Sequence, residues 1–416
     1  MTYIPIRTSA DGNALFQFGD SPSIDGFGRA RVSNSETLFD SKQIFDNAPL
    51  FWDDQETSGS GTSSTHSVDK AASTMGVSDL TAGVRVRQTF MRFNYQPGKS
   101  QFILLTGVIG SGDSGITQRI GYFDDDNGLF FAVEDGILKV VRRSSASGSP
   151  VDTGVAQASW NVDTMDGSGP SGITIDLTKT QIFCIDFEWL GVGRVRFGFV
   201  VDGQIVYCHE LLNANALSEV YMSTPNLPLR YEISNDGSGP SASMDHICTS
   251  IISEGGTQDL GILRYRSTTG QHINADVTNT QYGIIGLRLQ SSKSSGVVKM
   301  VSFSMINATI DNYEWRLVLN PVLGGVAPTF ADHSNSVLQA AIGERNAPGT
   351  TVTNGVPLQG GFVKSSGTSG AITVALENAI RLGVALDGTR DELWLVCRPL
   401  SPNADIDASI TWRELL

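Results

Sequence analysis

The stretch that most constrains the fold is residues 181–210, where three short segments alternate apolar and polar residues. The first segment alternates these side chains in order: Phe183, Cys184, Ile185, Asp186, Phe187, Glu188 and Trp189. Strict alternation at period two is typical of a half-buried β-strand. The second segment sets Arg194 and Arg196 against an apolar face, and Asp202-Gly203 supplies turn residues before the third. The sequence therefore predicts a three-stranded antiparallel meander.

The facing of these side chains also predicts the register of the first hairpin. Successive side chains of a strand point to opposite sides of the sheet. The apolar side chains of the two strands therefore lie on the same side only if the loop over residues 190–193 closes around a single central residue. This register places Asp186 and Glu188 beside Arg194 and Arg196 on the outer face. Cross-strand charge pairs contribute about 0.2–1 kcal/mol each, whereas a buried apolar side chain contributes about 1.5–3 kcal/mol. We therefore expect the inner face to hold the sheet together.

The rest of the chain favours strands and turns over helices. Its 416 residues exceed one ordinary core, and 45 glycines with only 17% charged residues are typical of β proteins. A helix competes only over residues 374–386, and the pattern leaves that segment open. We predict an all-β fold with two β-sandwich (jelly-roll-like) domains behind an extended N-terminal arm. The expected boundaries are 1–60 for the arm, 65–255 for a jelly roll and 256–416 for a smaller sandwich.

The first 60 residues hold many aromatic side chains with little alternation. The side chains that need a partner surface are Phe39, Phe45, Phe51 and Trp52. Either their own domain buries them, or the segment is an arm that docks onto another chain. We take these four as candidate assembly residues in a homo-oligomer, with a trimer favoured. Deleting residues 1–55 is then expected to leave the 65–255 domain folded.

Charge and cysteine usage exclude several functional classes. The net charge is −14, from 43 acidic and 29 basic residues, which disfavours binding to a nucleic-acid backbone. Neither a signal pattern at the N-terminus nor a run of about 18 apolar residues is found, so we expect a soluble protein without membrane insertion, made in a cytoplasm. The four cysteines lack CxxC spacing, which argues against a zinc site or redox pair.

Residues 121–128, 187–189 and 196–203 resemble the long strand, tight turn and Val-Asp-Gly hairpin of concanavalin-like and laminin-G-like jelly rolls. Retaining glycosidases of that fold carry Glu-x-Asp-x-Glu on one strand, because alternate residues place two carboxylates about 5 Å apart. Here the corresponding positions are Cys184, Asp186 and Glu188, with cysteine in place of the nucleophile. We therefore do not expect an enzyme.

A second resemblance extends over nearly the whole chain. Residues 25–32, 38–43, 121–128, 221–228 and 387–397 are similar to structural proteins of tailed bacteriophages, especially marine and cyanobacterial ones. The resemblance implies a component of the virion, made in the bacterial host, whose lectin-like domain decorates the particle or meets a host surface. The alternative is a module that binds or cleaves host surface polysaccharide.

Two candidate ligand sites follow from residue types. Asp124, Asp125, Asp126 and Asn127 offer hard oxygen ligands for calcium, but position twelve of that loop is Asp135 instead of glutamate. A plain hairpin turn is the preferred interpretation, and we predict no metal or other cofactor. A carbohydrate groove needs exposed aromatic rings, and the candidates are Trp160, Tyr221 and Tyr231.

Overall fold

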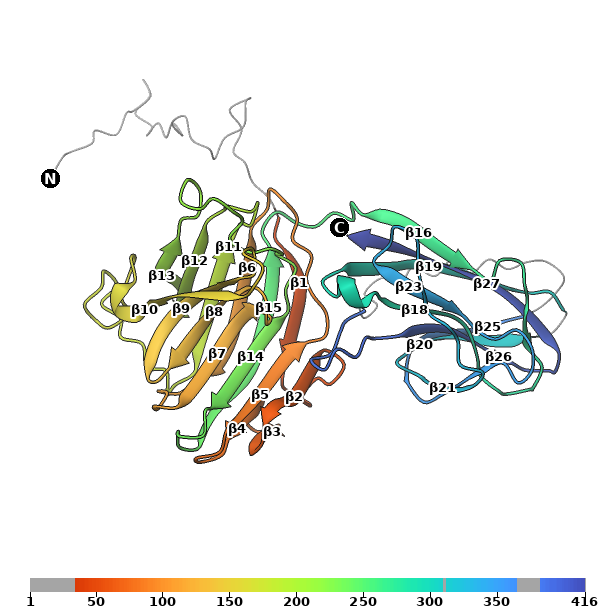
Figure 1. Cartoon of the computed structure of the whole chain (residues 1–416), viewed down its shortest axis with the longest axis horizontal. Helices are drawn as coiled ribbons and strands as arrows, with labels where there is room; N and C mark the ends of the chain where they lie inside the picture. Colours follow the sequence, from red (N-terminus) through yellow and green to blue (C-terminus); the bar gives the residue numbers. More distant parts are fainter. Residues whose placement is uncertain (1–33, 310–311, 365–381, 416) are drawn as a thin grey trace, which may run out of the picture.

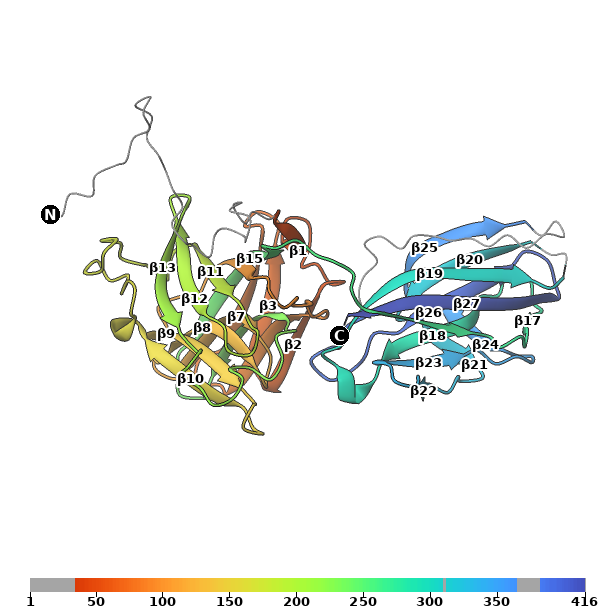
Figure 2. The same cartoon turned by 90° about the horizontal axis from the view of Figure 1, so that it is seen from above.

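The computed structural model describes residues 34–309, 312–364 and 382–415. These residues form antiparallel sheets, two single-turn 3₁₀ helices (Gln157–Ser159 and Ser291–Lys293) and no α-helix (Figure 1). The sheets make two sandwiches that lie beside each other along the long axis of the molecule, as Figures 1 and 2 show from two sides. The all-β prediction is confirmed. Within the described residues, no helix has the length and apolar composition needed to cross a bilayer.

The first sandwich packs an eight-stranded sheet against a seven-stranded one. The eight-stranded sheet runs in the order β13 (Gln204–Leu211), β12 (Val195–Val201), β11 (Gln181–Phe187), β6 (Gln101–Val108), β15 (Ala242–Ser253), β4 (Ala72–Val77) and β3 (Thr62–Ser67), with β1 (Glu36–Lys42) also paired to β15. The seven-stranded sheet runs in the order β10 (Val151–Ala156), β9 (Ile137–Ser144), β8 (Gly128–Glu134), β7 (Ile116–Phe123), β14 (Leu229–Asn235), β5 (Gly83–Thr89) and β2 (Trp52–Gly59).

The second sandwich packs a four-stranded sheet against an eight-stranded one. The four-stranded sheet holds β16 (Ile262–Ser267), β27 (Ala404–Leu415), β17 (Ile273–Ala275) and β19 (Val297–Asn307). The other sheet holds β21 (Val322–Gly325), β24 (Thr350–Thr353), β18 (Tyr282–Leu289), β26 (Leu393–Pro399), β20 (Tyr313–Leu319), β25 (Val356–Val363), β23 (Leu338–Ile342) and β22 (Ala331–Asp332). The segment with ambiguous helical pattern, 374–386, lies mostly outside the described residues.

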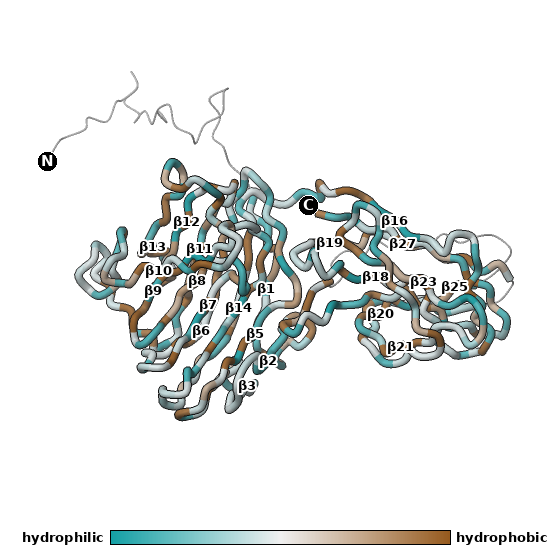
Figure 3. The backbone as a smooth tube through the Cα atoms, viewed as in Figure 1, coloured by the Kyte–Doolittle hydropathy of each residue, from teal (hydrophilic) through white to brown (hydrophobic). Residues whose placement is uncertain are grey.

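Each sandwich encloses its own apolar core. Phe131 lies at the centre of the first core, with its ring centroid 5.2–5.4 Å from those of Phe183, Phe197 and Phe199. Apolar and polar residues mix along the strands of both sandwiches (Figure 3). Burial alternates along β6 and β27, which have one face on a core, whereas β8 and β18 are buried on both faces.

The predicted meander and its register are confirmed. Phe187 of β11 pairs with Val195 of β12, and the hairpin closes around Gly191, whose φ of +80° suits glycine. Asp186 lies opposite Arg196, as the odd-numbered loop requires. The second turn carries Asp202 and Gly203 at φ of +51° and +77°, the positive values of a two-residue hairpin turn.

The N-terminal boundary differs from the prediction. Residues 36–59 are not an arm, because β1 and β2 are strands of the two sheets of the first sandwich, paired with β15 and β5. The first sandwich therefore includes strands well before residue 65. Of the two alternatives for this segment, packing on its own domain is the one found, and residues 1–33 lie outside the described part of the chain.

Candidate functional site

Strand β11 is the place where a carboxylate pair for glycoside hydrolysis would lie. Asp186 points away from the core, where its Oδ2 forms an ion pair with Arg196 and accepts a hydrogen bond from the Tyr207 hydroxyl at 2.8 Å. Cys184 occupies the position two residues earlier and is fully buried. Burial raises the pKa of the Cys184 thiol to about 12, and the charge of Asp186 adds to the rise.

The side chains at these positions are poorly suited to glycoside hydrolysis. A thiol with such a pKa stays protonated at neutral pH and is a poor nucleophile. Asp186 has its charge balanced by a neighbouring guanidinium, and Glu188 accepts a hydrogen bond from the backbone N–H of Arg194 at 3.3 Å. Strand β11 therefore does not provide the pair of free carboxylates that a retaining glycosidase uses.

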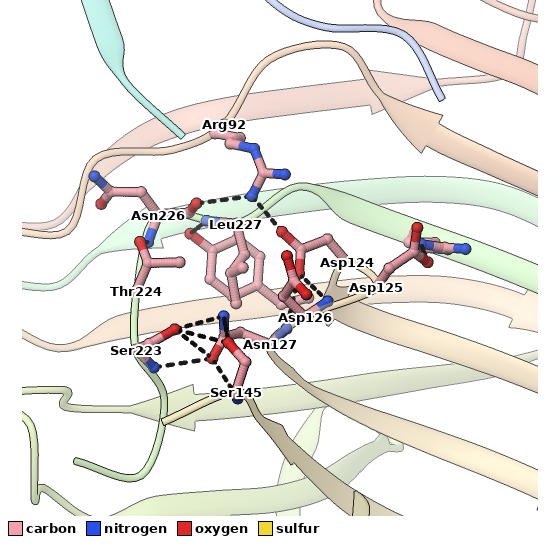
Figure 4. Close-up of polar contacts among 12 residues, drawn as sticks. Arg92, Asp124, Asp125, Asp126, Asn127, Ser145, Ser223, Thr224, Asn226 and Leu227 are labelled. Atoms are coloured by element: carbon pink, nitrogen blue, oxygen red, sulfur yellow. Dashed lines mark hydrogen bonds and ion pairs between the residues drawn. The ribbon is translucent and has the colours of Figure 1, made fainter. Parts of the chain in front are cut away.

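The candidate calcium loop is the hairpin between β7 and β8 (Figure 4). Asp124 Oδ2 accepts from Arg92 Nη1 at 2.6 Å, and its Oδ1 accepts from the backbone N–H groups of Asp126 and Asn127 at 2.9 and 2.8 Å. Asp125 is exposed and forms an ion pair with Arg230. Both oxygens of the buried Asp124 carboxylate thus already bind protein donors. Among the described residues, no group of three or more His, Cys, Asp or Glu side chains is placed to hold a metal ion.

The same hairpin is tied to the loop that precedes β14. The Asn127 side chain donates to the Ser145 and Ser223 hydroxyls at 3.1 and 2.9 Å, and its Oδ1 accepts from the Ser223 backbone N–H at 2.9 Å (Figure 4). Arg92 also donates to the Asn226 carbonyl at 3.2 Å. These contacts describe a closed structural network that stabilises one end of the sandwich.

The three aromatic residues predicted for a carbohydrate groove are not exposed. Trp160, Tyr221 and Tyr231 are 6%, 1% and 0% exposed and belong to the core of the first sandwich. Their polar atoms donate inward, Trp160 Nε1 to the Val155 carbonyl at 3.1 Å and the Tyr221 hydroxyl to the Glu188 carbonyl at 2.9 Å. A ring inside the core cannot stack on a sugar, so these three residues do not form a groove.

The four predicted assembly residues divide into two groups. Phe39 and Trp52 are buried, and Phe51 packs against the same core, so these three belong to the first sandwich. Phe45 is 88% exposed. It lies with Ile44, Pro49 and Leu50 in the lining of an apolar surface hollow of about 450 Å³.

Sequence reasoning missed a polar cluster inside the first sandwich. Apolar and basic residues alternate along β5, and one of the basic residues, Arg87, is fully buried between the two sheets. It donates to His246 Nδ1 at 3.0 Å and forms an ion pair with Asp54 at 3.0 Å. Val86 is also fully buried, so both faces of β5 are covered, which the alternation along this strand does not reveal.

Comparison with known proteins gives no family assignment. No family model matches the chain, and no curated protein matches it. Solved structures with some likeness include the β-glucanase of Bacillus licheniformis, with 9% identity over 53% of this chain and 99% of that chain and a TM-score of 0.35. The CBM2 module of the evolved Dit of Lactobacillus casei BL23 phage J-1 is 8% identical over 55% of this chain and 100% of that chain, with a TM-score of 0.34. The exoplasmic domain of VIP36, in a form bound to calcium and Man3GlcNAc, is 11% identical over 53% of this chain and 89% of that chain, with a TM-score of 0.31.

The three structures are thus a β-glucanase, a CBM2 module and a domain in a Man3GlcNAc-bound form. Similarity this low does not establish a function for the chain, and the proposals that follow rest on its own residues.

Proposed function

We propose that this chain is a non-enzymatic structural component of a tailed-phage virion, whose lectin-like sandwich faces the host surface. The observation that carries the proposal is the apolar hollow around Phe45, which a free subunit leaves in contact with water. The resemblance of five segments to phage structural proteins supports the same role, and so does strand β11, with Cys184 in place of a carboxylate.

The exposed apolar side chains of this hollow lie on the loop between β1 and β2. Phe45, Ile44 and Leu50 are 88%, 43% and 40% exposed. Contiguous exposed apolar side chains mark interaction sites, because each costs free energy while it faces water. A second copy of the chain in a homo-oligomer, with a trimer favoured, is the proposed partner that covers this surface in the particle.

The first test is the mass of the purified full-length protein by light scattering, compared with the Phe45→Ser variant. We expect an oligomer for the unchanged protein and a smaller species for the variant. The circular dichroism spectrum should stay unchanged, because the ring is exposed in the single subunit and its loss does not disturb the fold. Leu80→Ser changes another exposed apolar residue, which lies outside the hollow, and should leave the mass of the oligomer unaltered.

A monomer at all concentrations, with a mass that Phe45→Ser does not change, would contradict the role of this surface. The virion assignment has its own test, which is mass spectrometry of purified particles of the phage that encodes the chain. Absence of the protein from those particles would overturn the assignment.

A further inference from the structure

The sequence contains an asparagine followed by glycine at two places, Asn127-Gly128 and Asn354-Gly355. Asparagine is a thermolabile residue, because the backbone nitrogen of the next residue can attack the carbon of its side-chain amide. A following glycine has no side chain to hinder that attack, so the two pairs are chemically alike in an unfolded chain. The fold therefore decides which of them reacts in the native protein.

Asn127 is held by hydrogen bonds at both polar atoms of its side chain. Its Oδ1 accepts from the Ser223 backbone N–H at 2.9 Å and from the Ser223 hydroxyl at 3.1 Å (Figure 4). Its Nδ2 donates to the hydroxyls of Ser145 and Ser223. The residue is only 2% exposed. The side-chain amide therefore cannot turn toward the Gly128 nitrogen without breaking these bonds, and little water reaches it.

Asn354 has the opposite surroundings. It lies at the corner between β24 and β25 of the second sandwich and is exposed to solvent. Its side-chain amide makes no hydrogen bond with any of the described residues. The backbone N–H of Gly355 likewise has no acceptor within the described part of the chain. Neither of the two reacting groups is therefore tied to the rest of the sandwich by a hydrogen bond.

The corner itself requires these two residue types. Asn354 and Gly355 have φ of +54° and +80°, a left-handed conformation that asparagine tolerates better than most side chains and that glycine adopts freely. A Cβ atom at residue 355 would also lie 2.7 Å from Cγ1 of Val318, so the space there suits glycine alone. The backbone demand that favours asparagine and glycine at the corner thus also makes the corner chemically labile.

We propose that Asn354 is the residue at which the native protein deamidates. The backbone nitrogen of Gly355 bonds to the side-chain carbonyl carbon of Asn354 and loses its proton, and the side-chain nitrogen leaves as ammonia. Water then opens the resulting cyclic imide at either of its carbonyl carbons. Opening at one carbonyl gives aspartate, and opening at the other gives isoaspartate. The reaction consumes only water.

Each product changes the second sandwich in its own way. Aspartate keeps the backbone and adds a negative charge to a chain whose net charge is already −14. Isoaspartate lengthens the backbone at the corner, between the paired residues Thr353 and Val356. We expect the isoaspartate form to unfold at a lower temperature, because the strands on the two sides of the corner can no longer both keep their register.

The test incubates the full-length protein in mildly alkaline buffer and maps the products by digestion and peptide mass spectrometry, with an unincubated sample as the baseline. We expect the Asn354 peptide to convert to the acid at least about tenfold faster than the Asn127 peptide, which reacts only when the first sandwich opens. Enzymatic methylation of isoaspartate should label the Asn354 peptide. Protein unfolded in urea is the chemical control, and both peptides should convert there at similar rates.

Asn354→Gly is the matched variant, because glycine keeps the positive φ and has no side-chain amide. It should fold as the unchanged protein does and abolish the slow gain of negative charge that isoelectric focusing detects. Three results overturn the inference. They are conversion of Asn127 as fast as that of Asn354 in the folded protein, no conversion of Asn354 while the unfolded protein reacts at both sites, and an undiminished gain of charge in Asn354→Gly.

Discussion

At the scale of single residues, the buried His246 links the stability of the first sandwich to pH. Its ring is fully buried, stacks on Tyr231 at 4.1 Å between centroids, and accepts a hydrogen bond from Arg87. Burial, and then the positive charge of Arg87, lower the pKa of His246 well below its ordinary value. The folded protein therefore holds this histidine neutral.

The sign of the pH effect follows from that pKa. Below about pH 6.5 the unfolded chain takes up a proton that the folded state does not, so stability falls by about 1.4 kcal/mol for each further pH unit. We expect the unfolding temperature to drop between pH 7 and pH 5, and to drop less in His246→Gln. Equal pH dependence of both proteins in calorimetry would contradict this account.

Asp124 gives the second prediction at this scale. Asp124→Ala removes the acceptor of Arg92 and of two backbone N–H groups, and we expect a loss of about 1–3 kcal/mol in the free energy of unfolding. Asp126→Ala is the matched control in the same turn, since that residue is exposed. Denaturant unfolding measures both changes.

Whether the same turn binds calcium can be tested by adding the ion to the protein. Because the Asp124 oxygens are occupied by protein donors, we expect millimolar calcium to leave the unfolding temperature of the protein unchanged. A rise in that temperature that disappears in Asp124→Ala would show instead that the turn is a calcium site.

At the scale of elements, β1 and β2 decide how the N-terminal segment behaves. Phe39 of β1 packs on Phe93 with ring centroids 5.1 Å apart, and Trp52 of β2 donates from Nε1 to the Ser41 hydroxyl at 2.9 Å. Removing one buried Phe or Trp side chain costs about 3–5 kcal/mol, and a whole domain is stable by about 5–15 kcal/mol. Losing both strands therefore removes more stabilising free energy than the folded sandwich has in excess over the unfolded chain.

We therefore expect a chain that lacks residues 1–55 to lose the cooperative unfolding transition of the first sandwich. This reverses the expectation drawn from the sequence alone. A chain that begins at residue 34 is the control and should keep the transition in calorimetry. A folded sandwich in the shorter chain would show that β1 and β2 are dispensable.

At the scale of the whole molecule, the two sandwiches are joined by more than the chain that links them. The backbone N–H of Leu386 donates to Asp53 Oδ2 at 2.6 Å, and that of Val384 to the Phe90 carbonyl at 3.2 Å. These two contacts join the first sandwich to residues 384–386, which precede β26 of the second sandwich.

The sequence by itself determined the strands and the local register. The alternation over residues 181–210 and the turn at Asp202-Gly203 depend only on neighbouring residues, so the meander, its central Gly191 and the pairing of Asp186 with Arg196 were predictable. The all-β class followed for the same reason. Such features are local, because side-chain facing and turn conformation are set within a few residues.

Only the tertiary structure decided which faces are covered. Trp160, Tyr221 and Tyr231 look alike in sequence whether a sheet packs over them or water does, and the structure buries all three. The burial of Arg87 of β5 likewise depends on a strand far away in the chain, because its side chain contacts His246 of β15. Burial is a property of packed elements, so a pattern read along one segment cannot show it.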